Sequence, residues 1–275
     1  MQAQAFPNVG VNLQQAIQHQ NNELSKGSES NGFKFGILGS VEFKSINHRF
    51  QSDWRGVLTR IDDETEVYEK CSASPADCTP KVRQWRKLLE DLKGLPVKVQ
   101  LARLNKSINR MATYADDDKT FGKRDYWATP LEFLNGKADC ADYAAVKFWS
   151  LLELGFSNEQ LRLAVVRDRR RGIMHAVVTV DTEDGTIILD SLFDHPVEQR
   201  HVLKYAPIYS ANLDSNWVHI VTKKIRLSYI NSLDSRAKGR VIPVKAQKRI
   251  RPVVRPAGGL IGLAALKTPA FIDWT

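Results

Sequence analysis

Two β-branched runs joined by a short turn determine much of the fold that this chain can adopt. The runs are His175–Asp181 and Thr186–Asp190, and they flank the turn Thr182-Glu-Asp-Gly185. An Asp-Gly pair between two such runs is a strong β-hairpin signal. The sequence therefore predicts an antiparallel hairpin over this part of the chain.

The register of that hairpin decides whether a histidine and an aspartate meet. If Asp181 pairs with Thr186, then Val177 pairs with Asp190. His175 then lies on the same face as Asp190, as its diagonal cross-strand neighbour, with the two Cβ atoms about 7 Å apart. A slip of one residue would put the two side chains on opposite faces. In the first register, Asp190 can fix the tautomer of the imidazole and stabilise its charged form.

A helix that begins at a cysteine precedes the hairpin. Asp139 is a natural N-cap, Asp142 occupies the capping-box position, and Gly155 ends the pattern. The apolar band of this helix comprises Tyr143, Val146, Trp149, Leu151, Leu152 and Leu154. Cys140 therefore lies in the first turn, where the helix dipole favours a thiolate, the nucleophilic form of cysteine.

Each of these residues also has a purely structural interpretation. A single cysteine is more often a small buried apolar residue than a nucleophile. His195, His201 and His219 compete with His175, and any one of them is more often a surface or core histidine than a general base. An aspartate at position 190 can simply end a strand.

The rest of the chain is predicted to form one domain with two extensions. Residues 1–32, rich in Gln, Asn and Ser, form a disordered or weakly ordered arm. The domain covers 33–222, and 223–275 is a basic extension in which regular structure is doubtful. Further predicted elements are a helix over Pro80–Lys93 capped by Thr79, a helix after Pro96, and short strands at Tyr205–Ser210 and Asn216–Ile220.

The formal charge of +9 is concentrated near the C-terminal end. Residues 223–255 hold eleven Lys or Arg and one acid, Asp234, which gives 11 − 1 = +10. A basic segment of this kind can meet nucleic acid, anionic lipid or an acidic partner, but no nucleic-acid-binding module accompanies it, and a solvated extension is the simpler interpretation. No apolar run is long enough to span a membrane.

The three cysteines of the chain give information about the cellular compartment in which it resides. Cys71 and Cys78 flank a polar loop and can close a small disulfide, which would leave Cys140 as the odd thiol, although two free surface thiols would give the same sequence. A disulfide would indicate an oxidising compartment. Residues 1–10 lack the basic and apolar segments of a secretory signal, so a cytoplasmic location is the alternative.

An ordered set of motifs between about Trp54 and His219 resembles the bacterial transglutaminase-like cysteine peptidases. The motifs are Asp125–Leu134, Asp139–Ala144, Leu161–Leu163, His175–Val178, Ile187–Asp190 and Tyr205–Ser210. The resemblance implies an α+β fold with a papain-like, transglutaminase-like core, in which the cysteine-bearing helix packs on an antiparallel sheet. It also implies a catalytic triad of Cys140, His175 and Asp190.

The same resemblance implies a biological setting. Members of the best-known type are periplasmic proteases that cleave the N-terminal region of a large surface adhesin and so release cells from a biofilm. An inner-membrane cyclic-di-GMP receptor restrains them. The resemblance also implies calcium beside the active site. The ligand candidates here are Asp139 and one or more of Asp116, Asp117 and Asp118, with Asp117 the preferred one, although a solvated loop explains the three consecutive aspartates equally well. Ala141 replaces the usual acidic residue of the motif, which weakens that expectation, and no organic cofactor is expected.

Two alternatives to a cysteine endopeptidase remain open from the sequence. The same triad can pass an acyl group to an amine, as a transglutaminase does. The chain can also be a non-catalytic scaffold that binds a partner through its basic extension or its apolar C-terminal end.

Overall fold

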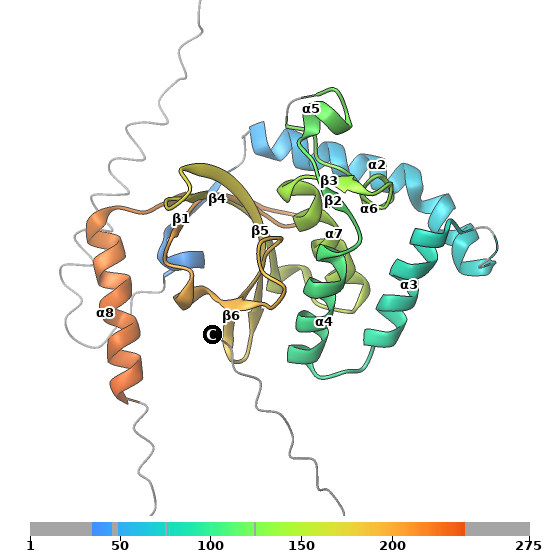
Figure 1. The fold of residues 1–275 in the computed structure, drawn as a ribbon. Coiled ribbons are helices and arrows are strands. Elements are labelled where there is room, and N and C mark those ends of the chain that lie inside the picture. Colours follow the sequence, from blue (N-terminus) through green and yellow to red (C-terminus); the bar gives the residue numbers. More distant parts are fainter. Residues whose placement is uncertain (1–34, 46–48, 75, 77, 124, 240–275) are drawn as a thin grey trace, which may run out of the picture.

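The computed structural model describes residues 35–45, 49–74, 76, 78–123 and 125–239 (Figure 1). The arm predicted at 1–32 and residues 240–275 of the predicted extension lie outside the described residues. The domain boundaries therefore stay a prediction.

A seven-stranded antiparallel sheet forms the centre of the fold, in the order β1-β9-β8-β4-β5-β6-β7. Its strands in chain order are β1 (Val41–Ser45), β4 (Leu161–Asp168), β5 (Ile173–Thr182), β6 (Gly185–Leu189), β7 (Val197–Glu198), β8 (Tyr205–Ala211) and β9 (Asn216–Ile220). A separate parallel pair joins β2 (Thr113–Tyr114) to β3 (Lys137–Ala138). The strands predicted near 205–210 and 216–220 are confirmed as β8 and β9.

The predicted hairpin is confirmed as β5 and β6, in the register that the sequence analysis required. Asp181 pairs with Thr186, and Val178 pairs with Leu189, so Val177 stands opposite Asp190. Gly185 begins β6 with φ at 121°, a backbone conformation that favours glycine. His175 and Asp190 consequently share one face of the sheet.

Helices make up the other layer. They are α2 (Arg49–Ala73), α3 (Pro80–Leu92), α4 (Val97–Asn109), α5 (Asp117–Thr120), α6 (Pro130–Phe133), α7 (Cys140–Glu153) and α8 (Lys223–Gly239), with 3-10 turns η1 (Ile37–Gly39), η3 (Asn158–Gln160) and η4 (Gln199–His201). Figure 1 shows α2, α3, α4 and α7 on one side of the sheet and α8 on the other. The predicted α+β class, with the cysteine-bearing helix on an antiparallel sheet, is confirmed.

Helix α7 is held against the sheet by one large apolar core. Its inward side chains, among them Ala144, Phe148 and Leu151, pack with Leu163 and Val178 of the sheet. A smaller cluster lies on the opposite face of the sheet and includes Ile37, Val166, Val177, Ile188 and Tyr205. The sheet is therefore buried on both faces where it carries His175.

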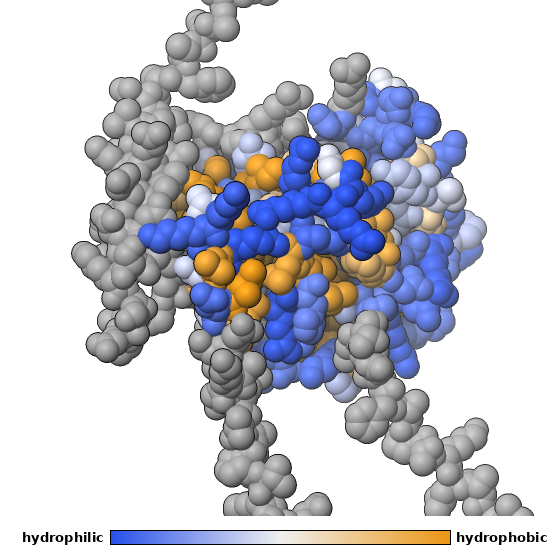
Figure 2. Space-filling model, turned by 60° about the vertical axis from the view of Figure 1, so that its left-hand side comes forward, coloured by the Kyte–Doolittle hydropathy of each residue, from blue (hydrophilic) through white to orange (hydrophobic). Residues whose placement is uncertain are grey.

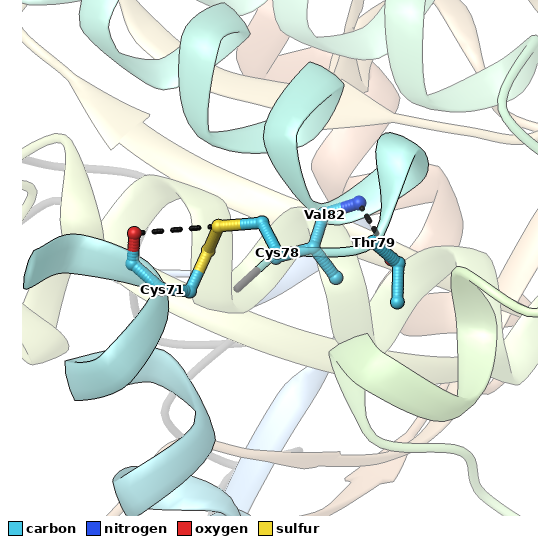
Figure 3. Close-up of a disulfide and its surroundings, with 4 residues drawn as sticks. All are labelled: Cys71, Cys78, Thr79 and Val82. Carbon is cyan, nitrogen blue, oxygen red and sulfur yellow. Dashed lines mark hydrogen bonds between the residues drawn. A yellow bond between two sulfur atoms is a disulfide. The ribbon is translucent and has the colours of Figure 1, made fainter. Parts of the chain in front are cut away.

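A disulfide joins Cys71, near the end of α2, to Cys78, two residues before α3 (Figure 3). Both half-cystines are buried. The side chain of Thr79 caps α3 by accepting a hydrogen bond from the N–H of Val82, as the sequence predicted. The cysteine pairing left open by the sequence is thus present in the structure.

The doubt about regular structure beyond Lys223 was wrong for residues 223–239, which form α8. Thr222 begins this helix by accepting a hydrogen bond from the N–H of Ile225. Ile225 and Tyr229, four residues apart, are buried against the domain. A Cβ on Gly39 would lie 2.2 Å from the ring of Tyr229, so the glycine lets α8 approach η1. The sequence did not predict this helix, because the apolar stripe of Ile225 and Tyr229 is short and lies among many basic residues.

Within the described part of the chain, no helix has the length and apolar character needed to cross a membrane.

Candidate active site

The N-terminus of α7 places Cys140 as the sequence predicted. The carboxylate of Asp139 accepts hydrogen bonds from the N–H groups of Ala141 (2.7 Å) and Asp142 (3.3 Å). Asp142 in turn accepts from the N–H of Asp139 at 3.0 Å, which completes the capping box. Cys140 is the first residue of the helix, and its side chain is partly exposed.

His175 and Asp190 form a buried pair at the end of the sheet. Nε2 of His175 lies 2.7 Å from Oδ1 of Asp190, and the two side chains are 3% and 1% exposed. The remaining ring nitrogen, Nδ1, is therefore the one that is available for proton exchange with a thiol. The imidazole ring also lies 5.8 Å from the ring of Tyr205, centroid to centroid.

Asp190 is held by three further donors. Tyr205 donates its hydroxyl to Oδ2 at 2.6 Å, the N–H of Leu192 bonds to Oδ1 at 2.9 Å, and the amide of Asn109 bonds to the backbone carbonyl at 3.0 Å. Burial acts to raise the pKa of Asp190, but His175, Tyr205 and Leu192 outweigh it and hold that pKa below its ordinary value. Asp190 is thus an ionised, fixed acceptor for the imidazole.

Cys140 lies beside the strand that carries His175. The backbone N–H of Ala176, the next residue along β5, donates to the thiol of Cys140. Burial and then the charge of Asp139 nevertheless raise the pKa of the thiol to about 12. The expected lowering by the helix N-terminus is therefore outweighed, and a base must remove the thiol proton for the sulfur to react.

The competing histidines lie elsewhere. His219 is buried between Ser40 (2.9 Å) and Ser210 (2.8 Å), and burial lowers its pKa to about 3. It is a satisfied core histidine. His195 and His201 are exposed on the loop and turn that follow β6.

Three carboxylates gather beside Cys140. Ligand oxygens of Asp117, Asp139 and Asp142 lie within 4.8 Å of one another. Burial, followed by the charge of Asp139, raises the pKa of Asp117 to about 6 and that of Asp142 to about 8, and burial raises the pKa of Asp139 as well. The structure therefore brings together both predicted ligand candidates and adds Asp142, while Asp116 and Asp118 stay exposed.

The donors of this cluster fit a hard cation. Oδ1 of Asp117 is buried and has no hydrogen-bond partner within the described residues, while Oδ2 accepts from the N–H of Tyr126 at 2.7 Å. Three carboxylates with one unpartnered buried oxygen match the all-oxygen ligand set that calcium prefers.

Tyr126 and Trp127, which precede Cys140 in the chain, both have packing roles. Tyr126 bonds through its hydroxyl to Glu132 and stacks against Arg60. Trp127 is buried and its ring lies edge-on to Trp54.

Two contacts of the site were not expected from the sequence: Tyr205 donates to Asp190, and Asp142 lies beside Asp117. Asp142 had been assigned to the capping box, and the structure confirms that role alongside its place in the acidic cluster. Tyr205 stands in the resembling motif Tyr205–Ser210, which was the available signal.

Comparisons with known proteins identify the family of this chain. A family model described as bacterial transglutaminase-like cysteine proteinase matches residues 61–224, more than half of the chain. Calcium-bound Legionella pneumophila LapG is 27% identical, with a TM-score of 0.49 over 63% of this chain and 98% of that chain. EGTA-treated LapG from the same organism gives the same identity and TM-score over 62% and 96%.

Another solved structure is a more distant match. A putative cysteine protease from Cytophaga hutchinsonii is 10% identical, with a TM-score of 0.33 over 52% of this chain and 55% of that chain. No curated protein matches. Because the family model covers more than half of the chain, the chain is a cysteine protease with a protein substrate and belongs to the bacterial transglutaminase-like cysteine proteinases.

Proposed function

We propose that the chain is a cysteine endopeptidase whose catalytic triad is Cys140, His175 and Asp190. The observation that carries this proposal is the buried pair of His175 and Asp190, whose side chains are 2.7 Å apart. Ala176, which follows His175 in β5, donates its backbone N–H to the thiol of Cys140. In this proposal the three groups act in series as nucleophile, base and orienting acid, which is the arrangement that activates a cysteine.

The proposed reaction is acyl transfer to water. The sulfur of Cys140 attacks a peptide carbonyl as Nδ1 of His175 takes the thiol proton, and the imidazolium returns that proton to the leaving amine. A thioester remains on Cys140. A water molecule, deprotonated by the same nitrogen, then hydrolyses the thioester and restores the thiol. Asp190 keeps the ring in the required tautomer through Nε2.

We further propose the substrate and setting that the family resemblance implies. The substrate is the N-terminal region of a large surface adhesin, cleavage releases cells from a biofilm, and an inner-membrane cyclic-di-GMP receptor restrains the protease. The Cys71–Cys78 disulfide supports a periplasmic location, because disulfides persist in oxidising compartments.

We also propose that calcium binds at Asp117, Asp139 and Asp142. The unpartnered Oδ1 of Asp117 supports this site, and Ala141 supplies no carboxylate to it. Bound calcium would supply positive charge that offsets the carboxylates next to Cys140 and favours the thiolate.

Thiol reactivity tests the triad without a known substrate. Wild type and His175→Ala are mixed with a mild thiol electrophile near neutral pH, with Cys140→Ala as the blank for other sites. We expect Cys140 to react at least about 10-fold faster in wild type, since the raised pKa of the thiol makes its ionisation depend on the imidazole. Equal rates would refute the triad and favour a non-catalytic scaffold.

A cleavage assay separates hydrolysis from amine transfer. The protein is incubated with an N-terminal fragment of a candidate adhesin and a labelled primary amine, and the products are weighed by mass spectrometry. We expect a shortened fragment without label, and none with Cys140→Ala. A labelled adduct on an uncut fragment would assign transglutaminase activity instead.

A further inference from the structure

The turn between β4 and β5 presents a group of arginines beside the candidate active site. Arg169, Arg170 and Arg171 occupy the turn, and all three are exposed. The turn is closed by a hydrogen bond from the N–H of Gly172 to the carbonyl of Asp168 at 2.8 Å. Arg167, at the end of β4, is exposed as well.

Asp168 fixes the backbone of this turn. Its side chain is fully buried, and Oδ1 accepts from the N–H groups of Arg170 (2.9 Å) and Arg171 (3.1 Å). Its other oxygen lies 3.4 Å from the ammonium of Lys204. The one acid of the turn is therefore engaged by backbone and lysine, and the guanidinium groups extend from a fixed backbone.

The guanidinium groups of Arg167, Arg169, Arg170 and Arg171 form no ion pair with any residue that the structure describes. More positive charge lies nearby instead. Burial and then the charge of Arg169 lower the pKa of Arg226 in α8, which places the two arginines close together. A concentration of unpaired positive charge favours association with an acidic partner.

This surface, formed by Arg167 and Arg169–Arg171 and called the arginine turn, stands at the edge of the candidate active site. The turn leads directly into β5, where His175 is the third residue. Between them, Ile173 and Met174 are 42% and 45% exposed and offer apolar contact beside the charges. Figure 2 shows one face of the molecule, on which hydrophilic side chains extend across a hydrophobic area.

Tyr114 is an exposed residue close to Cys140 in the fold. It is 60% exposed and pairs with Ala138, two residues before the cysteine. Burial and then the charge of Cys140 raise the pKa of Tyr114 to about 12, and the charge of Arg171 acts in the opposite direction. Arg171 lies five residues before Ala176, whose N–H bonds to the thiol of Cys140, so an extended substrate segment of about five residues is long enough to reach from Cys140 to the arginine turn.

We infer that the arginine turn binds an acidic segment of the protein substrate that flanks the scissile bond. The inference rests on the proposed function, which places that bond at Cys140. Guanidinium groups pair with carboxylates through two parallel hydrogen bonds, and charges at the rim of a binding surface mainly increase the rate of association. A substrate with carboxylates near the cleavage point would therefore be captured in preference to a neutral one.

A binding assay tests the inference without requiring turnover. The full chain carrying Cys140→Ala is titrated against a fluorescent peptide of alternating alanine and glutamate, and against its glutamine counterpart. We expect the glutamate peptide to bind about 10-fold more tightly, and Arg170→Glu/Arg171→Glu to abolish the preference. The preference should also fall as NaCl rises from about 50 mM to about 300 mM.

Arg103→Glu/Lys106→Glu is the matched control, because both residues are exposed cations of α4 and the variant reverses the same number of charges elsewhere. It should retain the preference. The basic C-terminal segment is identical in all variants, so its own attraction for glutamate cancels from the comparison. Equal affinity for the two peptides, or an equal loss in both charge variants, would overturn the inference.

Thiol labelling separates this outcome from failure of the proposed function. Labelling of wild type and His175→Ala, both of which keep the arginine turn, reports on the triad independently of substrate binding. If labelling is normal and the glutamate preference is absent, the arginine turn has no role in recognition while the triad stands. If labelling fails in wild type, the proposed function itself fails.

Discussion

Three carboxylates, two of them buried and that of Asp139 partly exposed, lie closer together beside Cys140 than like charges favour. The pKa of Asp117 and that of Asp142 are raised to about 6 and about 8, by burial and then by the charge of Asp139. Backbone N–H groups compensate part of this repulsion, since each of the three side chains accepts at least one of them. The arrangement persists because the fold fixes it, as expected for a site prepared for a cation.

Asp117→Asn is predicted to weaken calcium binding while leaving the fold intact. The variant keeps an acceptor for the N–H of Tyr126 but loses one negative charge of the cluster. We expect the affinity for calcium to fall at least about 10-fold, measured by titration calorimetry. Calcium should raise the Tm of wild type, and EGTA should reverse that rise.

Asp118→Asn is the matched control for this prediction. Asp118 is the next residue in α5, is exposed, and lies outside the carboxylate cluster. It should bind calcium as wild type does. Identical calcium titrations for Asp117→Asn and wild type, or a wild-type Tm that calcium leaves unchanged, would remove the metal site from the proposal.

Single elements differed in how far the sequence could predict them. The hairpin of β5 and β6 and the start of α7 were predictable because local chemistry determines them: Asp184-Gly185 sets the turn and Asp139 sets the cap. The pairing of His175 with Asp190 followed from strand parity alone. Such local interactions form without contacts to distant segments of the chain.

Other elements depend on contacts between distant segments. No prediction was made for α2, although Trp54 within it is buried and bonds through its indole to the carbonyl of Asn212. Helix α8 likewise needs Gly39 and Phe35, far away in sequence, to cover Tyr229. The raised pKa of Cys140 has the same origin, because burial by the fold outweighs the helix dipole.

Removal of the disulfide is predicted to loosen the connection between α2 and α3. The bond between Cys71 and Cys78 closes a loop with a sequence separation of 7. The chain-entropy model gives about 2 to 3 kcal/mol for a loop of that size. We expect Cys71→Ser/Cys78→Ser to lower the free energy of unfolding in urea by that amount.

Reductant provides the internal check on that result. It should lower the unfolding midpoint of wild type toward that of Cys71→Ser/Cys78→Ser, and leave the double variant unchanged. A double variant as stable as oxidised wild type would show that the loop is held by its packing, since both half-cystines are buried.

At the scale of the whole molecule, the tight packing between helices and sheet has enclosed a lysine. Lys147 of α7 is fully buried, and its ammonium group has no hydrogen-bond partner within the described residues. It lies two helical turns after Cys140. Burial lowers its pKa to about 7, although the charges of Asp190 and Asp194 act to raise it. No sequence pattern reveals such a residue, because the layers that bury it come from separate parts of the chain.

Stability should consequently rise with pH above neutrality. The pKa of Lys147 is about 7 in the folded chain, against an ordinary value of 10.5. Between these values the unfolded chain holds the proton and the folded chain has released it, so unfolding takes up a proton and becomes less favourable as pH rises. The contribution has a slope of at most about 1.4 kcal/mol per pH unit within that window.

Lys147→Met should remove this contribution, because methionine fills a similar volume without a charge. Urea unfolding at several pH values from about 6 to about 9 would measure it. We expect Lys147→Met to be more stable than wild type near neutral pH and the advantage to shrink as pH increases. Lys106→Met, at an exposed position of α4, should follow the wild-type pH profile. Parallel profiles for wild type and Lys147→Met would contradict this prediction. They would mean that the buried ammonium keeps its proton, because attraction to Asp190 and Asp194 offsets the cost of burying its charge.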